Sequence, residues 1–180
     1  MNMRFLGTKR RCVFLAMPAV MVVALVSFSV HVSAETIMVG WGERVFIEPG
    51  GFKLRAKIDT GAVSCSLHAP NAVEYDNDGK KWVRFTIKDD DGKERVIDQP
   101  VIGTRRIKRH YGQYQLRPVI RMKICLGSVC KEADVNLVDR TGFEFPMLIG
   151  RNFMEGSIVV NPSVQYTVEP ALAAGARERK

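Results

Sequence analysis

The sequence predicts one compact, mainly β domain, folded as a barrel or a sandwich. Residues 52–58 alternate between apolar and basic side chains, which is the period of a half-buried strand. Similar runs recur along the chain and are joined by short segments rich in Gly, Pro, Asp and Asn. No stretch keeps a helical period over three turns, and only a short turn or helix is expected after Gly150.

The N-terminal residues 1–34 have the pattern of a secretory signal peptide. Four basic residues precede an apolar run at 12–30, and Val32 and Ala34 are small residues placed for cleavage after Ala34. The run is long for a signal core, so an uncleaved membrane anchor is the alternative. Both interpretations predict export, to the periplasm or the medium, or to the periplasmic face of the inner membrane.

The domain expected after the signal, residues 35–168, can bury one hydrophobic core but not two. Residues 169–180 lack alternation, end in charge and are predicted to form a disordered tail. The signal holds four of the 27 basic residues, which leaves 23 against 19 acidic residues. An exported domain with so small a positive excess has little compositional support for nucleic-acid binding, and none is expected.

The expected strands follow in order along this domain. They cover residues 37–39, 44–48, 52–58, 82–88, 94–102, 118–126, 128–138 and 146–149. Gly127-Ser128 suits the centre of a type II′ turn, which would place Cys125 opposite Cys130 as a non-hydrogen-bonded pair. Such pairs lie about 4.5 Å apart at Cα, so a disulfide can form, and two reduced cysteines are the alternative.

Three ordered motifs carry the functional signal. The segment IDTGAVSCSLHA at 58–69 contains Asp59-Thr60-Gly61 directly after an expected strand. RPVIRMKI follows at 117–124 and FPMLIGRNF at 145–153. In this order the motifs resemble the retropepsin-like aspartic peptidases, and most closely the bacterial branch described as ATP-dependent zinc proteases, over residues 37–160.

This resemblance implies a closed β-barrel with a flap hairpin, assembled as a homodimer. An aspartic peptidase needs two carboxyl groups that share one proton, and this chain has one Asp-Thr-Gly triplet. Asp59 of each subunit would therefore complete the dyad across a two-fold axis. The implied function is an exported aspartic endopeptidase that activates water to hydrolyse peptide bonds.

The resemblance also assigns residues that support the catalytic loop. Gly150 would pack behind it and Arg151 would brace it with a forked set of donors. Viral relatives place an acidic partner for this arginine shortly after the triplet, where the present sequence has Val63 and Ser64, so the partner of Arg151 is left open. The full set of expected support residues is Thr60, Gly61, Ala62, Gly150, Arg151 and Asn152.

A flap is expected at residues 105–117, with its tip near His110, Tyr111, Gly112 and Gln113. Its expected substrate-binding residues are Arg109, His110, Tyr111 and Gly112. Basic side chains crowd this hairpin, which favours acidic peptide substrates. A solvated basic hairpin with no binding role is the alternative.

The sequence supports a zinc site less strongly than it supports the aspartic dyad, and no cofactor is expected. The candidate ligands are Cys65 and His68, with His110 and Asp59 as further candidates, whereas zinc needs about four convergent ligands. The sequence has no nucleotide-binding loop, so any use of ATP would fall to another protein. A zinc-dependent peptidase and a catalytically inactive peptide-binding module therefore remain as alternatives to the aspartic peptidase.

Overall fold

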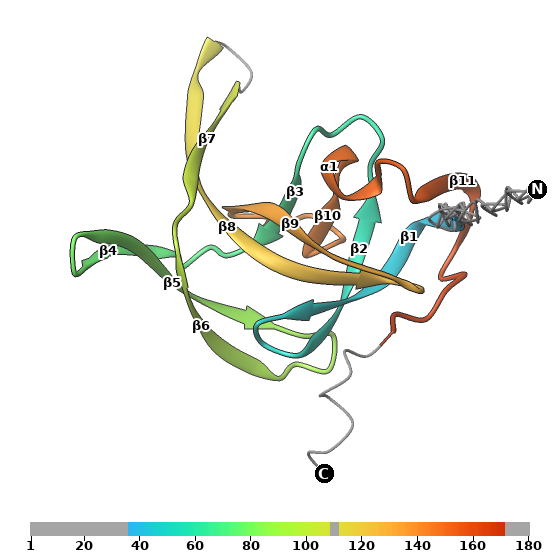
Figure 1. Ribbon diagram of the computed structural model, residues 1–180, viewed down its shortest axis with the longest axis horizontal. Coiled ribbons are helices and arrows are strands. Elements are labelled where there is room, and N and C mark those ends of the chain that lie inside the picture. The colour runs from blue at the N-terminus through green and yellow to red at the C-terminus, as the bar shows by residue number, and fades with distance from the viewer. Residues whose placement is uncertain (1–35, 109–111, 172–180) are drawn as a thin grey trace, which may run out of the picture. The chain divides into compact units, whose positions relative to one another are not determined.

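The computed structural model describes residues 36–108 and 112–171, which form a mainly β domain with one short helix (Figure 1). The strands are β1 (Ile37–Glu48), β2 (Phe52–Ile58), β3 (Cys65–His68), β4 (Val73–Asn77), β5 (Lys80–Lys88), β6 (Glu94–Pro100), β7 (Gly103–Lys108), β8 (Tyr114–Leu126), β9 (Val129–Val138), β10 (Met147–Ile149) and β11 (Ile158–Gln165). The helix α1 (Arg151–Met154) follows Gly150, where the sequence predicts a short turn or helix.

Six strands close into a barrel. The larger sheet has the order β11-β1-β2-β10-β3-β9-β8-β7, and an additional pairing of β1 with β8 joins the ends of the central six strands. The predicted closed β-barrel is therefore confirmed. Strands β4, β5 and β6 form a separate three-stranded sheet, and β7 extends the larger sheet beyond β8.

Alternation along the strands fills the barrel. On β2, Leu54, Ala56 and Ile58 are buried while Lys53 and Lys57 are exposed, as the period of two requires. The same core includes apolar residues of β5 and β6, so the small sheet shares the hydrophobic core of the barrel. Burial of one face from each strand stabilises the fold, at about 25 cal/mol for each Å² of apolar surface removed from water.

The insertion of β10 between β2 and β3 determines where the site lies. Ile149 on β10 is the parallel partner of Ile58 on β2, and Leu148 is the antiparallel partner of Ser66 on β3. Parallel neighbours end at the same edge of a sheet. The chain after Ile149 therefore emerges next to the chain after Ile58, although these residues are distant in sequence.

Strand β1 is longer than expected. The sequence predicts separate strands at 37–39 and 44–48, because Gly40 and Gly42 interrupt the alternation, and this division is wrong. A register shift between the two glycines keeps the strand continuous against β2 and β11. A Cβ atom at Gly40 would overlap the backbone of Val164, so the close approach of β11 requires a glycine there.

Three strands were not predicted, and one ends early. Strands β3 and β4 are short, and β11 carries polar residues and Pro162, so each gives a weak periodic signal. Strand β6 ends at Pro100 rather than at residue 102. Proline lacks the N–H group that a strand interior uses in pairing, which accounts for the earlier end.

The β8–β9 hairpin has the predicted register. Cys125 and Cys130 are direct partners, with Leu126 opposite Val129. Gly127 has φ of +55°, which suits the first central position of a type II′ turn. A disulfide joins Cys125 to Cys130, whose Cα atoms lie 4.1 Å apart.

Two predicted terminal segments fall mainly outside the described residues. The expected signal or anchor, residues 1–34, is among them, as are residues 172–180. Within the described chain, no helix is long and apolar enough to cross a membrane. Of the tail expected at residues 169–180, residues 169–171 are described: Pro170 is buried and Ala171 N–H donates to Gly127 O at 2.8 Å.

Candidate active site

Asp59 is the first residue after β2, and hydrogen bonds fix its position. Its N–H donates to Ile149 O at 2.9 Å, which ties it to the end of β10. Its carboxylate Oδ1 accepts from Gly61 N–H at 3.0 Å, and Lys57 Nζ lies 3.7 Å from Oδ2. The side chain remains 28% exposed, so the fixed carboxylate can meet a ligand or a second carboxyl group.

The Asp loop, residues 59–64, rests on the segment that follows β10. Gly150 packs against it so closely that an added Cβ atom would lie 2.6 Å from Ser64 C. Backbone N–H groups of Arg151 and Asn152 donate to Ala62 O at 2.9 Å and Val63 O at 3.1 Å. The two sequence motifs therefore form one unit in space.

The side chain of Arg151 braces the Asp loop through its backbone. Nη1 donates to Thr60 O at 2.8 Å and to Gly61 O at 3.0 Å. The sequence left the partner of this arginine open, and the structure gives two carbonyl groups in place of an acidic side chain. A guanidinium can reach both because its donors point in fixed directions.

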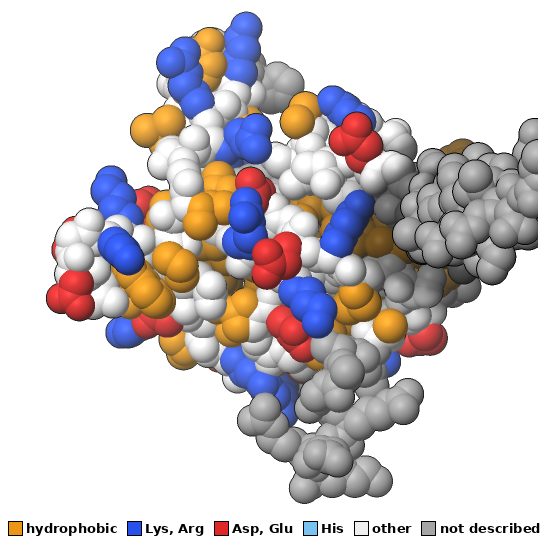
Figure 2. All heavy atoms as spheres, viewed as in Figure 1, with side chains coloured by type: hydrophobic (Ala, Val, Ile, Leu, Met, Phe, Trp, Pro, Cys, Tyr) orange, Lys and Arg blue, Asp and Glu red, His pale blue; other side chains and the backbone are white. Residues whose placement is uncertain are grey.

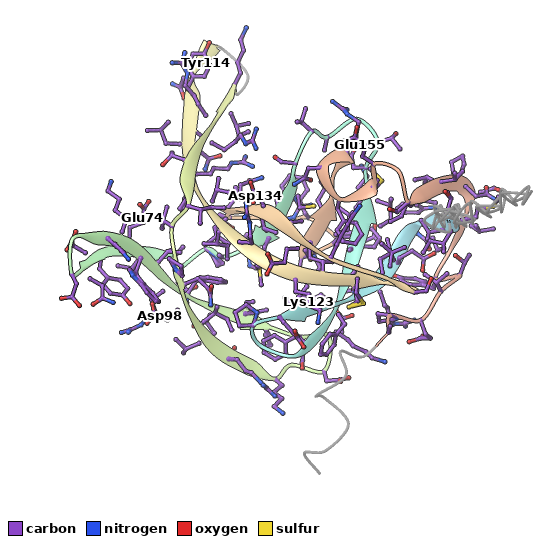
Figure 3. All side chains as sticks on the ribbon, in the orientation of Figure 1. Glu74, Asp98, Tyr114, Lys123, Asp134 and Glu155 are labelled. Carbon is purple, nitrogen blue, oxygen red and sulfur yellow. A yellow bond between two sulfur atoms is a disulfide. The ribbon has the colours of Figure 1, made fainter. Side chains whose placement is uncertain are left out.

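The side chain of Asn152 connects the start of β3, directly after the Asp loop, to strand β9. Its Oδ1 accepts from Cys65 N–H at 3.0 Å, and its Nδ2 donates to the backbone O of Asp134, a residue labelled in Figure 3, at 2.9 Å. Cys65 is buried behind the loop, and this burial raises the pKa of its thiol to about 11. Its sulfur is therefore protonated at neutral pH and packs as part of the core.

The candidate zinc ligands Cys65 and His68 do not converge. They are three residues apart on β3, and an odd spacing in a strand places side chains on opposite faces. His68 Nδ1 instead accepts from Arg140 N–H at 2.9 Å. Across residues 36–108 and 112–171, no group of three or more His, Cys, Asp or Glu side chains could hold a metal, and His110 lies outside these ranges.

Two arginines approach the site from other parts of the chain. Arg140 Nη1 donates to Ser66 Oγ at 3.0 Å, and Arg117 Nη1 donates to Asn136 Oδ1 at 3.0 Å. Burial lowers the pKa of Arg140, the charge of Arg117 lowers it further, and the charge of Asp59 raises it. Arg140 and Asn136 were not predicted as site residues, because they lie outside the recognised motifs, whereas Arg117 was placed in the flap.

Lys57 was also missed, although the strand period pointed to it. Residues two apart on a strand share a face, so Lys57 and Asp59 would be neighbours if the strand direction continued past Ile58.

The expected flap is a hairpin of β7 and β8 that projects from the barrel (Figure 1). Three of its expected substrate-binding residues, Arg109, His110 and Tyr111, lie outside the described residues, while Gly112 is described and has φ of +74°. Basic side chains gather at the outer end of the hairpin (Figure 2), where Arg106 stacks 3.7 Å from the ring centre of Tyr114.

A hollow of about 390 Å³ adjoins the Asp loop. It is lined by Thr60, Arg151, Met154, Glu155, Gly156, Ile158 and Val160. Thr60 is exposed and its hydroxyl makes no hydrogen bond within the described residues, and Val63 is 58% exposed. The loop thus presents a hydroxyl and an apolar side chain to the surface, beside strand β11.

Known proteins are similar to this chain in sequence and fold. Residues 38–171 match the family model described as RimB-like, retropepsin-like aspartic endopeptidase RimB. A structure of a protein of unknown function (DUF785) from Legionella pneumophila has 31% identity and a TM-score of 0.62, covering 73% of this chain and 98% of that one.

Curated relatives are much longer proteins. A probable alpha-L-glutamate ligase of Desulfotalea psychrophila is 32% identical over 123 residues, which is 67% of this chain and 26% of the relative. One from Shewanella halifaxensis is 31% identical over 116 residues, 63% of this chain and 25% of the relative. The chain thus spans about a quarter of these relatives. The family match covers most of the chain, including the braced Asp loop, and the chain therefore belongs to the RimB-like family of retropepsin-like aspartic endopeptidases.

Proposed function

We propose that this protein is an aspartic endopeptidase that works as a homodimer, with one Asp59 from each subunit. The observation that carries the proposal is the geometry of Asp59. Its carboxylate is oriented by Gly61 N–H, and its loop is held from behind by Gly150 and Arg151. A group held this firmly on rigid strands suits catalysis, because a small misplacement of a catalytic group can cost about 10²-fold in rate.

Dimerisation is required because one chain supplies one such carboxylate. Thr60, which lines the hollow, and Val63 are exposed residues of the Asp loop and are suited to contact a second copy. Strand β11 borders the same hollow and is the terminal strand of the larger sheet, and within residues 36–108 and 112–171 no strand pairs with its other edge. Such an edge can pair with a second chain. A two-fold axis beside the Asp loop would bring the two carboxyl groups together.

In this mechanism the two carboxyl groups share one proton. The ionised Asp59 removes a proton from water as the water oxygen attacks the scissile carbonyl carbon. The partner subunit's Asp59, which is protonated, gives its proton to the carbonyl oxygen. The resulting diol collapses, a proton passes to the amide nitrogen, and the C–N bond breaks to leave a carboxyl group and an amine.

Acidic peptides are the proposed substrates. The hairpin of β7 and β8 is rich in basic residues, and Arg140 lies near enough to both Asp59 and Arg117 for their charges to act on it. Positive potential along a cleft attracts and orients negatively charged ligands. The relatives that contain a matching region are named for joining glutamate, which fits a substrate rich in glutamate.

We further propose that the protein is exported, with residues 1–34 as the signal or anchor. The disulfide of Cys125 and Cys130 supports this proposal, because such bonds persist in oxidising compartments. Sequencing the N-terminus of the protein recovered from a periplasmic fraction would test it. Cleavage after Ala34 is expected, whereas recovery from the cytosol with residues 1–34 intact would contradict export.

The peptidase experiment compares wild type with Asp59→Asn on an oligoglutamate peptide and a matched oligoglutamine peptide, with products identified by mass spectrometry. Asn is nearly isosteric with Asp but cannot take the proton from water, so cleavage should stop while the fold is retained. A chelator should have no effect, since a zinc-dependent peptidase would lose activity on metal removal. Undiminished cleavage by Asp59→Asn would refute the proposal, and sedimentation should show a dimer in the active wild-type protein.

A further inference from the structure

A row of side chains crosses the outer face of the barrel beside Asp59. Lys57, Leu148, Ser66 and Asn136 are register partners on the neighbouring strands β2, β10, β3 and β9. Register partners project to the same face, so these side chains, here called the outer row, stand next to one another on strands about 4.8 Å apart. The row begins at Lys57, whose ammonium group is 3.7 Å from the Asp59 carboxylate.

Two arginines cover the far half of the outer row. Arg140 donates from Nη1 to Ser66 Oγ at 3.0 Å and from Nε to Phe145 O at 3.0 Å. Arg117 donates from Nη1 to Asn136 Oδ1 at 3.0 Å. Since Ser66 and Asn136 are partners on adjacent strands, both guanidinium groups are fixed above neighbouring points of the row, and both arginines remain half-buried.

The positive charges gathered here favour an anionic ligand. Arg105 is the direct partner of Arg117 across β7 and β8, which adds a third half-buried arginine. Like charges opposite each other on adjacent strands repel. Arg140 makes no salt bridge with any residue that the structure describes, and its fixed contacts are with neutral oxygen atoms. An anion placed between the arginines would relieve this repulsion.

We propose that Arg117 and Arg140 form a subsite for the carboxylate of an aspartate or glutamate side chain in a peptide lying over the outer row. The assignment rests on the peptidase function proposed above. Two strand spacings, about 10 Å, separate Lys57 from Ser66. An extended peptide advances about 3.3 Å per residue, so the bound acidic residue lies within about three residues of the scissile bond. Guanidinium forks bind carboxylates in a defined orientation, which makes these arginines specificity-determining residues.

The test measures binding separately from cleavage. Fluorescence anisotropy of a labelled oligoglutamate peptide is recorded with the inactive Asp59→Asn protein, and an oligoglutamine peptide is the neutral reference. Adding Arg117→Gln or Arg140→Gln should weaken oligoglutamate binding by at least about 10-fold, as expected for loss of a charged hydrogen-bonding partner. Binding of oligoglutamine should stay unchanged.

Arg121→Gln is the matched control. Arg121 lies on β8 with the same side-chain parity as Arg117, and it pairs with Asp134 at 2.8 Å. Its replacement removes the same charge farther along the strand, so oligoglutamate affinity should change by no more than about twofold at physiological salt, where exposed charges are screened.

Each outcome decides between clear alternatives. Unchanged oligoglutamate binding in Arg117→Gln, or an equal loss in Arg121→Gln, overturns the subsite. If Arg140→Gln fails to fold on losing its bonds to Ser66 and Phe145, the Arg117→Gln result decides alone, with thermal melting as the check on its fold. If oligoglutamate binding depends on the arginines but the wild-type protein does not cleave the peptide, the subsite is supported and the peptidase function is refuted. Cleavage that does not depend on the arginines refutes the subsite alone.

Discussion

Glu43 offers a stringent test of how the end of the domain is held. Its side chain is fully buried on β1, and Oε1 accepts hydrogen bonds from Gly40 N–H at 2.7 Å, Thr167 N–H at 2.9 Å and Thr167 Oγ1 at 2.6 Å. Oε2 accepts from Val168 N–H at 3.4 Å. One carboxylate thus joins β1 to the segment that follows β11.

The expected loss of stability in Glu43→Ala follows from the backbone N–H groups that now donate to the Glu43 carboxylate. Gly40 N–H keeps an alternative acceptor in Thr167 Oγ1 at 3.2 Å, whereas the N–H groups of Thr167 and Val168 would lose the acceptor they have in the structure. Thr167 is exposed and Val168 is half-buried, so water can replace part of what their N–H groups lose. At a net value of about 0.5–1.5 kcal/mol for each hydrogen bond, the free energy of unfolding should fall by about 1–3 kcal/mol. Glu43→Gln keeps one oxygen acceptor and should cost less.

The assay is urea unfolding followed by tryptophan fluorescence, with wild type and both variants at one protein concentration because dimerisation would add to stability. A loss of less than about 0.5 kcal/mol in Glu43→Ala, the range of ordinary surface substitutions, would refute the role assigned to Glu43. Equal losses in the two variants would show that the retained acceptor contributes nothing.

Three further predictions concern the site and the hairpin. Gly150→Ala should lower the free energy of unfolding by about 1–3 kcal/mol, since its new Cβ atom meets the Asp loop backbone at 2.6 Å, whereas Gly103→Ala, with nothing within 4 Å, should be nearly neutral in the same urea assay. Burial raises the pKa of Cys65 from 9.0 to about 11, so the stability that the protonated thiol contributes is complete below pH 9 and is lost as pH rises toward 11. The advantage of wild type over Cys65→Ser should therefore shrink between these pH values, and a constant difference would contradict the assignment. Reducing the disulfide of Cys125 and Cys130, which are five residues apart, should lower the free energy of unfolding by about 2 kcal/mol in urea with and without reductant.

Local patterns were enough to predict much of the fold. The alternation on β2, β5 and β8 follows from a side-chain period of two, and the turn at Gly127-Ser128 sets the register that pairs Cys125 with Cys130. Short or irregular strands were not predicted, because their alternation of apolar and polar residues is weak. The hydrogen bond from Ala171 N–H to Gly127 O joins residues distant in sequence, so no local pattern could predict it.

The sequence by itself determined the strand alternation, the hairpin register and the presence of the Asp-Thr-Gly and Gly-Arg-Asn motifs, because each depends on residues close together along the chain. Only the tertiary structure decided how these pieces meet. Insertion of β10 between β2 and β3 brings Arg151 onto the carbonyl groups of the Asp loop and orients Asp59. The tertiary structure also decided that Arg140 lies beside Ser66 and that Cys65 and His68 face in opposite directions. Strand order and side-chain direction are properties of the closed barrel as a whole.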